Sequence, residues 1–320
     1  MSNSRRSFLH TTLAAGFTGA AAAGQNASRD ARQGWTPPSP ETVKLPNAAA
    51  ELQVPKMKFF NAEIGRLVLG TNPFYGFSHY NNNFSVMMQD YYTPGKVCDV
   101  MHQANRFGVN AFNYVHLGRA PQDLAHFQAE GGKMHLIVQC IGDAETVYKA
   151  VKPLAMYKQG EEVDKAFQNG EMDEVKEWCK RARGLGVVVG VGTHKPEVIA
   201  YVEEQGWDVD FYAGCVYNRT RTGDEWKQVL HGESLEMSQE IYLRSDPPRM
   251  YKVMRQTKKP CFAFKILAAG RLSEREMDHA YQTAFESIKA TDGVFVGIFP
   301  RVRDEIRENV ERIHRVLVHG

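Results

Sequence analysis

Three side chains in this sequence have the type and the surroundings that acid–base or nucleophilic chemistry needs. His194 lies between a glycine-rich segment and Pro196, which opens a predicted helix. We expect its ring to face a pocket and to exchange protons near neutral pH. His116 follows an apolar segment in a similar way. Lys265 ends the apolar run 261–264, where loss of ammonium solvation would lower the pKa of its amine and suit a base, an anion clamp or a Schiff-base nucleophile.

Each of these residues also has a structural interpretation. His194 alternatively caps the helix that follows it, and Lys265 alternatively pairs with a carboxylate or extends to solvent.

A divalent metal site normally takes three or four His, Asp or Glu ligands. The predicted strand ends supply only His116, Asp143 and His194, so we expect no bound metal.

The elements that must position these residues follow a regular pattern from residue 59 onward. Short β-branched runs alternate with amphipathic stretches, a pattern that predicts parallel strands joined by helices. The predicted strands are 66–70, 111–114, 136–140, 154–157, 187–191, 211–215, 261–265 and 293–298. The predicted helices are 96–107, 120–130, 144–151, 173–184, 196–205, 246–257, 274–289 and 303–317. This alternation indicates an α/β fold, a single-domain (β/α)8 TIM barrel over residues 57–320, a fold that takes about 250 residues.

Segments outside the regular alternation are expected to close the barrel and to bind the substrate. A hairpin, residues 57–60 and 64–69, precedes the first strand and is expected to plug the barrel floor. The two longest loops, 77–95 and 216–245, follow strands and must emerge on the carboxyl face, where TIM barrels hold their active sites. Their Tyr, Trp, Asn and His residues suit a polyhydroxylated ligand, with an aromatic structural lid as the alternative. The residues expected to bind the substrate are Asn72, Tyr75, Asn113, Tyr217, Asn218 and Trp226.

The amino-terminal residues resemble a targeting signal. The segment 4–9 contains the pair Arg5 and Arg6 and precedes a weakly apolar, Ala-rich run, as twin-arginine translocation signals do. The run is shorter than the ~20 apolar residues of a membrane span. The resemblance implies a twin-arginine signal peptide over residues 1–30, the export machinery as a partner, and a periplasmic or extracellular mature protein. A chance arginine pair in an Ala-rich tail is the alternative, and residues 31–56 are predicted to be a Pro-containing linker.

The distribution of charge and cysteine excludes two classes of protein. The formal net charge is +2, yet residues 1–58 hold seven Lys or Arg and three Asp or Glu, so the rest of the chain is slightly acidic. A broad basic surface for nucleic acid does not follow from such a balance. The five cysteines are widely spaced, which indicates buried free thiols rather than a disulfide scaffold.

Three segments resemble the aldo/keto reductase family. Residues 59–76 (FFNAEIGRLVLGTNPFYG) are similar to its N-terminal hairpin and first strand, and residues 108–118 (GVNAFNYVHLG) to its second strand. Residues 297–310 (GIFPRVRDEIRENV) are similar to its last strand and the helix that follows. The resemblance implies NAD(P) binding, with the positions expected at the cofactor being Arg271, Arg301, Glu308 and Asn309.

The catalytic residues of that family are not matched. Its aspartate falls at Asn113 and its tyrosine at Leu117, while residues 138–140 hold no lysine and residues 157–159 no histidine. The family's standard proton relay is therefore not implied by the resemblance.

The leading hypothesis is an exported, aldo/keto-reductase-like barrel enzyme that acts on a small carbohydrate or carbonyl substrate, with NAD(P)-linked oxidoreduction as one form of its chemistry. His194 and His116 would then exchange protons, and Lys265 would activate the carbonyl. The first alternative is a cofactor-free or Schiff-base lyase or isomerase that uses Lys265. The second alternative is a non-catalytic barrel that binds a ligand.

Overall fold

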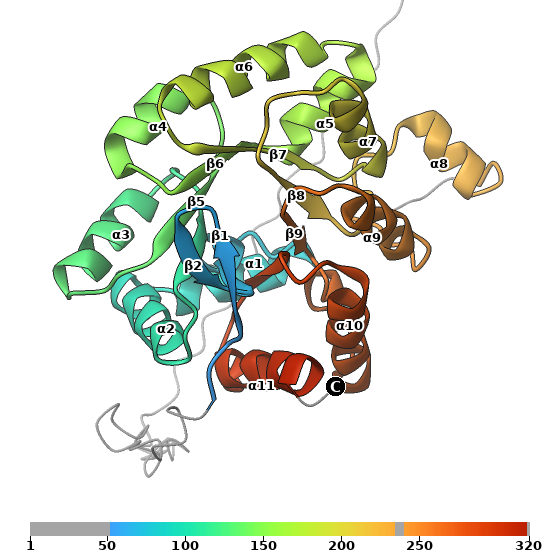
Figure 1. Cartoon of the computed structure of the whole chain (residues 1–320). Coiled ribbons are helices and arrows are strands. Elements are labelled where there is room, and N and C mark those ends of the chain that lie inside the picture. The colour runs from blue at the N-terminus through green and yellow to red at the C-terminus, as the bar shows by residue number, and fades with distance from the viewer. Residues whose placement is uncertain (1–51, 234–239, 319–320) are drawn as a thin grey trace, which may run out of the picture. The chain divides into compact units, whose positions relative to one another are not determined.

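The computed structural model describes residues 52–233 and 240–318, which form a closed barrel of parallel strands surrounded by helices (Figure 1). The barrel strands are β3 (Leu67–Gly70), β4 (Ala111–Tyr114), β5 (His135–Cys140), β6 (Ala155–Lys158), β7 (Val188–Thr193), β8 (Phe211–Cys215), β9 (Cys261–Phe264) and β10 (Gly293–Gly297). Each strand pairs with the next along the chain, and β10 pairs with β3 to close the ring. The predicted (β/α)8 TIM barrel is confirmed.

The helices that the alternation predicts are all present around this ring. They are α2 (Pro94–Arg106), α3 (Ala120–Ala129), α4 (Ala144–Val151), α6 (Met172–Gly184), α7 (Pro196–Glu204), α9 (Asp246–Gln256), α10 (Glu274–Ser287) and α11 (Glu305–Val318). Their apolar faces pack on the outside of strands whose residues are almost all buried. Figure 1 shows these helices as an outer ring around the strands.

Three further helices and two single turns in the described residues lie where the sequence pattern predicts no helix, and two of these helices fall within the predicted loops 77–95 and 216–245. They are α1 (Asn82–Tyr91), α5 (Gly160–Asn169), α8 (Gly223–Val229) and the 3₁₀ turns η2 (Asn72–Tyr75) and η3 (Ala268–Gly270). Side chains cap the three helices: Asn81 accepts from the backbone of α1, Gln159 from that of α5, and Thr222 forms a capping box with Glu225 at α8. Local capping by polar residues therefore forms helices where the composition resembles a loop.

The amino-terminal hairpin closes the floor of the barrel as predicted. It consists of β1 (Lys56–Phe59) and β2 (Ala62–Gly65), an antiparallel pair that lies across the middle of the ring in Figure 1. Phe59 is fully buried and meets Phe211 and Phe262 edge-on, with ring centroids 5.5 and 5.2 Å away. Contacts between aromatic rings from different strands therefore fill the interior of the barrel at this end.

The predicted leader and linker lie mostly outside the residues that the structure describes. The predicted signal peptide, residues 1–30, and the predicted linker up to residue 51 lie outside the described residues. The linker was predicted to run to residue 56, but Val54 is already buried and its amide donates to the Phe107 carbonyl at 2.9 Å. In the described part of the chain, no helix has the length and hydrophobicity that crossing a bilayer requires. The five cysteines are free and buried, as predicted.

The packing of Phe59 generates a stability prediction. Replacing Phe59 with Ala would empty a volume shared by three rings and is expected to lower the free energy of unfolding by about 3–5 kcal/mol. The adjacent Phe60 is 40% exposed, so Phe60→Ala is the matched control and should cost far less. Denaturant titration followed by circular dichroism measures both. Equal effects of the two substitutions would contradict the assignment of the hairpin as a floor plug.

Candidate active site

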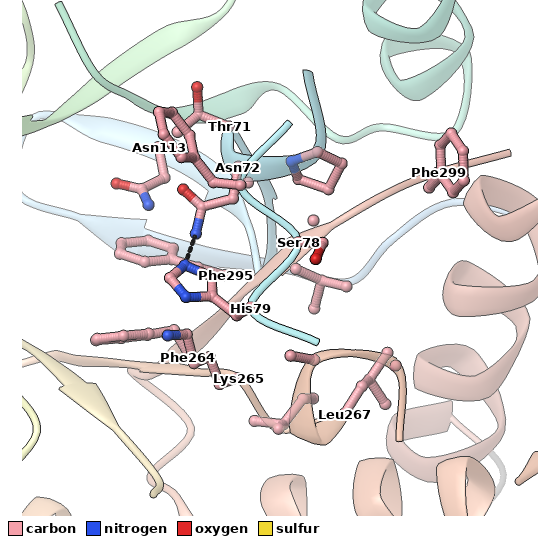
Figure 2. Close-up of a pocket in the computed structure, with 18 of the residues that line it drawn as sticks. Thr71, Asn72, Ser78, His79, Asn113, Phe264, Lys265, Leu267, Phe295 and Phe299 are labelled. Atoms are coloured by element: carbon pink, nitrogen blue, oxygen red, sulfur yellow. Dashed lines mark hydrogen bonds between the residues drawn. The ribbon is translucent and has the colours of Figure 1, made fainter. Parts of the chain in front are cut away.

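A cavity of about 470 Å³ opens at the carboxyl ends of the barrel strands. Its walls come from residues that follow the strands, among them Asn72 after β3, Gln159 after β6, His194 after β7 and Lys265 after β9. Figure 2 shows Asn72, His79 and Lys265 gathered in the same part of this cavity. This is the face on which TIM barrels place their active sites.

His194 is held in one orientation by a buried carboxylate. Its Nδ1 lies 2.7 Å from Oδ2 of Asp164, and its backbone amide donates to the same oxygen at 3.0 Å. Asp164 lies on α5 and is fully buried. Burial lowers the pKa of His194 although Asp164 acts in the opposite direction, and the charges of Lys265 and Arg219 lower it further. His194 is therefore neutral, with a hydrogen on Nδ1 and a lone pair on Nε2.

His79 forms a second histidine–carboxylate pair in the same cavity. Its Nδ1 lies 2.6 Å from Oε1 of Glu240, and its Nε2 lies 3.0 Å from Nδ2 of Asn72 (Figure 2). Because the Asn72 amide nitrogen can only donate, Nε2 of His79 accepts and Nδ1 carries the hydrogen. Burial, together with the positive charges of Lys265 and Arg219, lowers the pKa of His79 to about 2. His79 is thus also a neutral imidazole with its Nε2 lone pair turned to polar partners in the cavity.

Lys265 directly follows β9, which ends one residue earlier than the predicted strand 261–265. Its backbone has φ +62°, a left-handed conformation that non-glycine residues rarely adopt outside sites that hold them there. Its side chain is 9% exposed, and Nζ lies 3.7 Å from Oε2 of Glu240. Burial lowers the pKa of the Lys265 amine to about 7, and the charge of Arg219 also lowers it. A large fraction of this amine is therefore a neutral nucleophile at neutral pH.

Arg219 connects the two histidine pairs. Its Nη1 lies 3.3 Å from Nε2 of His194 and 3.1 Å from Oε1 of Glu161, and its Nη2 pairs with Glu240. Its Nε is buried and has no hydrogen-bond partner among the described atoms. Arg219 therefore holds a positive charge beside Lys265 while both histidines stay neutral, and this charge helps to lower the pKa of the lysine amine.

The structure brings some of the predicted site residues to this cavity. The predicted residues that line it are Asn72, Asn113, His194, Lys265, Glu308 and Asn309. The Asn113 side chain accepts a hydrogen bond of 2.9 Å from the Tyr157 hydroxyl, which leaves its amide nitrogen for other partners.

The other predicted residues are not among those that line the cavity. Nδ1 of His116 lies 2.9 Å from the Tyr114 hydroxyl, and Tyr75 lies against a separate, smaller pocket beside Arg119. Nη1 of Arg301 lies 3.8 Å from Oδ2 of Asp90. These side chains are used in local packing and ion pairs.

Four predicted residues from the loops after β8 and β9 also have partners outside the cavity. Tyr217 packs edge-on against Tyr242, and Trp226 lies under the guanidinium of Arg221. The backbone N–H of Asn218 donates to Oδ2 of Asp246 at 3.2 Å. Arg271 stacks on the rings of Tyr242 and Tyr80, with distances of 4.2 and 5.0 Å to their centroids. These contacts fit the structural lid that the sequence left as an alternative.

Sequence reasoning missed His79, Glu161 and Arg219, which line the cavity, and also missed Asp164 and Glu240, which pair with histidines of the lining. Asp164 had a usable signal, because it falls among apolar residues on one face of a segment, 160–169, that has helical spacing. Glu161 opens the same helix, while His79, Arg219 and Glu240 lie in irregular segments, and nothing in their local sequence indicates that they meet.

One group of residues in the described part of the chain could hold a metal ion: Cys98, His126 and Glu130, whose ligand atoms lie within 4.8 Å of one another. This group is on α2 and at the end of α3 and shares no residue with the cavity lining. His116, Asp143 and His194, which the sequence singled out as the strand-end ligands, do not form such a group among the described residues.

Comparisons with known proteins find similarity in the fold and none in sequence families. No family model matches the chain, and no curated protein sequence matches it. A truncated 3-deoxy-D-arabino-heptulosonate 7-phosphate synthase from Thermotoga maritima is similar in structure, with a TM-score of 0.46, 12% identity, and coverage of 82% of this chain and 91% of that one. A phospho-2-dehydro-3-deoxyheptonate aldolase (DAHP synthase) from the same organism gives a TM-score of 0.49, 11% identity, and coverage of 86% and 77%.

The family assignment suggested by the sequence is wrong: these structural neighbours are DAHP synthases, not aldo/keto reductases, and no family model of any kind matches. The barrel itself accounts for part of the motif likeness. A Cβ on Gly70 would come within 2.8 Å of the Gly297 amide nitrogen. Two of the segments that suggested the family contain these glycines, which a closed barrel needs where neighbouring strands approach closely.

The lowered pKa of Lys265 generates a labelling prediction. Its amine should be half neutral near pH 7, so its acetylation rate should rise through pH 7 and level off about two pH units higher. Ordinary lysines, with a pKa of about 10.4, should continue to gain reactivity up to pH 10. Competitive labelling with trace acetic anhydride and peptide mass spectrometry measures both curves. A Lys265 curve that runs parallel to the surface lysines would contradict the assignment.

Proposed function

We propose that this chain is a cofactor-independent lyase or isomerase that forms a Schiff base between Lys265 and the carbonyl group of a small, hydroxylated substrate. Of the chemistries expected from the sequence, this one is supported best by the residues of the cavity. The observation that carries the proposal is a buried lysine at the end of a barrel strand, in the same cavity as two histidines whose Nδ1 atoms lie 2.7 and 2.6 Å from carboxylate oxygens.

The first step needs a neutral amine and a proton donor. The lone pair of Lys265 Nζ attacks the carbonyl carbon as the C=O π bond breaks, and the carbonyl oxygen takes up a proton from solvent, which gives a carbinolamine protonated on nitrogen. Loss of water then leaves an iminium ion, whose positive charge draws electrons from the adjacent carbon. The low pKa of Lys265 favours attack, because the neutral form is available without a separate base.

The second step needs a base beside the iminium. A proton leaves either the carbon next to the imine, for isomerisation, or a hydroxyl one bond further, for cleavage of the carbon–carbon bond. In both cases the electron pair ends in the iminium. Nε2 of His194 is a suitable acceptor because Asp164 fixes the hydrogen on Nδ1 and stabilises the imidazolium that forms. His79 has the same pairing with Glu240, and its Nε2 accepts from Nδ2 of Asn72, so this histidine fixes the orientation of an amide in the cavity wall.

Amide side chains along the wall support a hydroxylated substrate. Asn72, Asn113, Gln139 and Gln159 all line the cavity, and amides offer both donors and acceptors to hydroxyl groups. Polar groups at a few fixed points in a largely apolar cavity are typical of small-molecule sites.

Export and cofactor binding stay separate predictions. Export through the twin-arginine pathway depends on Arg5 and Arg6, and Arg5→Lys with Arg6→Lys should keep the protein in the cytoplasm. Binding of NAD(P) near Glu308 and Asn309 depended on the family resemblance, and native mass spectrometry of the purified protein tests it directly.

Borohydride trapping tests the proposed Schiff base. With glycolaldehyde or dihydroxyacetone at pH 7, sodium borohydride should reduce the imine to a stable secondary amine, found on Lys265 by peptide mass spectrometry. Lys265→Met should abolish this adduct. Lys195→Met is the matched control, because Lys195 is also buried but its Nζ pairs with Glu225 at 2.9 Å. The absence of an adduct, or its persistence in Lys265→Met, would refute the proposal.

Proton exchange tests the role of His194. The protein should exchange the carbon-bound protons next to the carbonyl of hydroxyacetone in D₂O, measured by NMR. His194→Gln should slow this exchange by about 10²–10⁴-fold while borohydride trapping at Lys265 continues. A different result would identify a non-catalytic binding barrel. In that case the unmodified protein shows neither trapping nor exchange, while hydroxyacetone still binds to Lys265→Met and to His194→Gln.

A further inference from the structure

Four large apolar side chains are exposed to solvent around the mouth of the cavity. Phe77 is 50% exposed, Leu117 44%, Ile141 38% and Phe84 37%. All four line the same cavity as Lys265. Large exposed apolar side chains cost free energy in water, so their concentration at one site indicates something that covers them.

We call these four residues the apolar rim. Its members follow three adjacent strands of the barrel: Phe77 and Phe84 come after β3, Leu117 after β4 and Ile141 after β5. The charged residues of the cavity lie after other strands, with Glu161 after β6. The exposed apolar side chains therefore gather at one side of the cavity mouth, and the acidic and basic residues lie at the other.

The chemistry of the rim selects the kind of group that it can bind. Phenylalanine, leucine and isoleucine side chains have no hydrogen-bond donor or acceptor, so they gain nothing from the hydroxyl groups of a sugar. An apolar ring gains from burial against them, and aromatic rings pack well edge-on or offset against phenylalanine.

We propose that the substrate carries an aromatic group, which the apolar rim binds while the carbonyl group of the same molecule reaches Lys265. This proposal rests on the proposed function, because it takes the same cavity as the site of imine formation. The rim lines a concave site with a reactive lysine inside, which favours part of a small molecule over a flat protein surface as the occupant.

Two pairs of probes separate binding at the rim from reaction at Lys265. Phenylacetaldehyde and glycolaldehyde both form imines and are compared by borohydride trapping. 2-Phenylethanol and ethylene glycol cannot form imines and are compared by calorimetric binding. The variants are Leu117→Ser and Ile141→Ser. The control is Val302→Ser, which removes an 89% exposed apolar side chain that is not part of the cavity lining.

We expect the unmodified protein to be half trapped at a phenylacetaldehyde concentration roughly tenfold below that needed for glycolaldehyde. Each rim variant should shrink this ratio severalfold, and Val302→Ser should leave it unchanged. 2-Phenylethanol should bind with the same dependence on the rim, and ethylene glycol should not. If 2-phenylethanol binds in this way but no aldehyde is trapped, the rim proposal stands and the proposed function fails.

Equal trapping of the two aldehydes in every variant would overturn the rim proposal and leave the proposed function intact. A change of oligomeric state in the rim variants, seen by light scattering without any change in probe binding, would also overturn it. That result would assign the rim to contact between copies of the chain.

Discussion

A single buried carboxylate, that of Asp164, holds together the segments that form the cavity wall around His194. It accepts hydrogen bonds from the Thr193 hydroxyl, from the amide and ring of His194, and from the Thr220 hydroxyl. These donors belong to the end of β7 and to the segment after β8, while Asp164 lies on α5. Burying an ionised carboxylate is costly unless such donors surround it. The position of α5 against β7 and the orientation of His194 therefore depend on the same group.

The electrostatics of the cavity follow from this arrangement. Burial, together with the charges of Lys265 and Arg219, lowers the pKa of His194 and keeps the imidazole neutral although Asp164 acts in the opposite direction, while Asp164 fixes the hydrogen on Nδ1. Burial lowers the pKa of the Lys265 amine, and the charge of Arg219 lowers it further, since the guanidinium cannot be deprotonated in proteins and the lysine is the group that loses its proton. The left-handed backbone of Lys265 is a local cost that the closed barrel tolerates at this strand end. Stability is thus given up at the position where reactivity is gained.

The gathering of exposed apolar side chains at one side of the cavity mouth has a topological basis. The side chains at the exits of neighbouring strands lie side by side, so residues after β3, β4 and β5 share one side of the mouth. Helix α1, capped by Asn81, carries Phe84 to that side. A loop without this helix would not hold a large apolar side chain in place over the opening. The apolar rim and the residues around Lys265 can therefore recognise different parts of one molecule.

The sequence by itself determined the barrel. Alternating strand and helix periods marked all eight strands to within one or two residues, because side chains buried on both faces of a parallel strand give unbroken apolar runs. It also placed His194 and Lys265 at strand ends that face the cavity. It did not reveal α1, α5 and α8, whose ends are set by single capping side chains, and glycines that serve strand packing suggested the wrong family. Only the tertiary structure decided the partners of His194 and Lys265, because Asp164, Arg219 and Glu240 come from distant segments whose meeting depends on barrel closure.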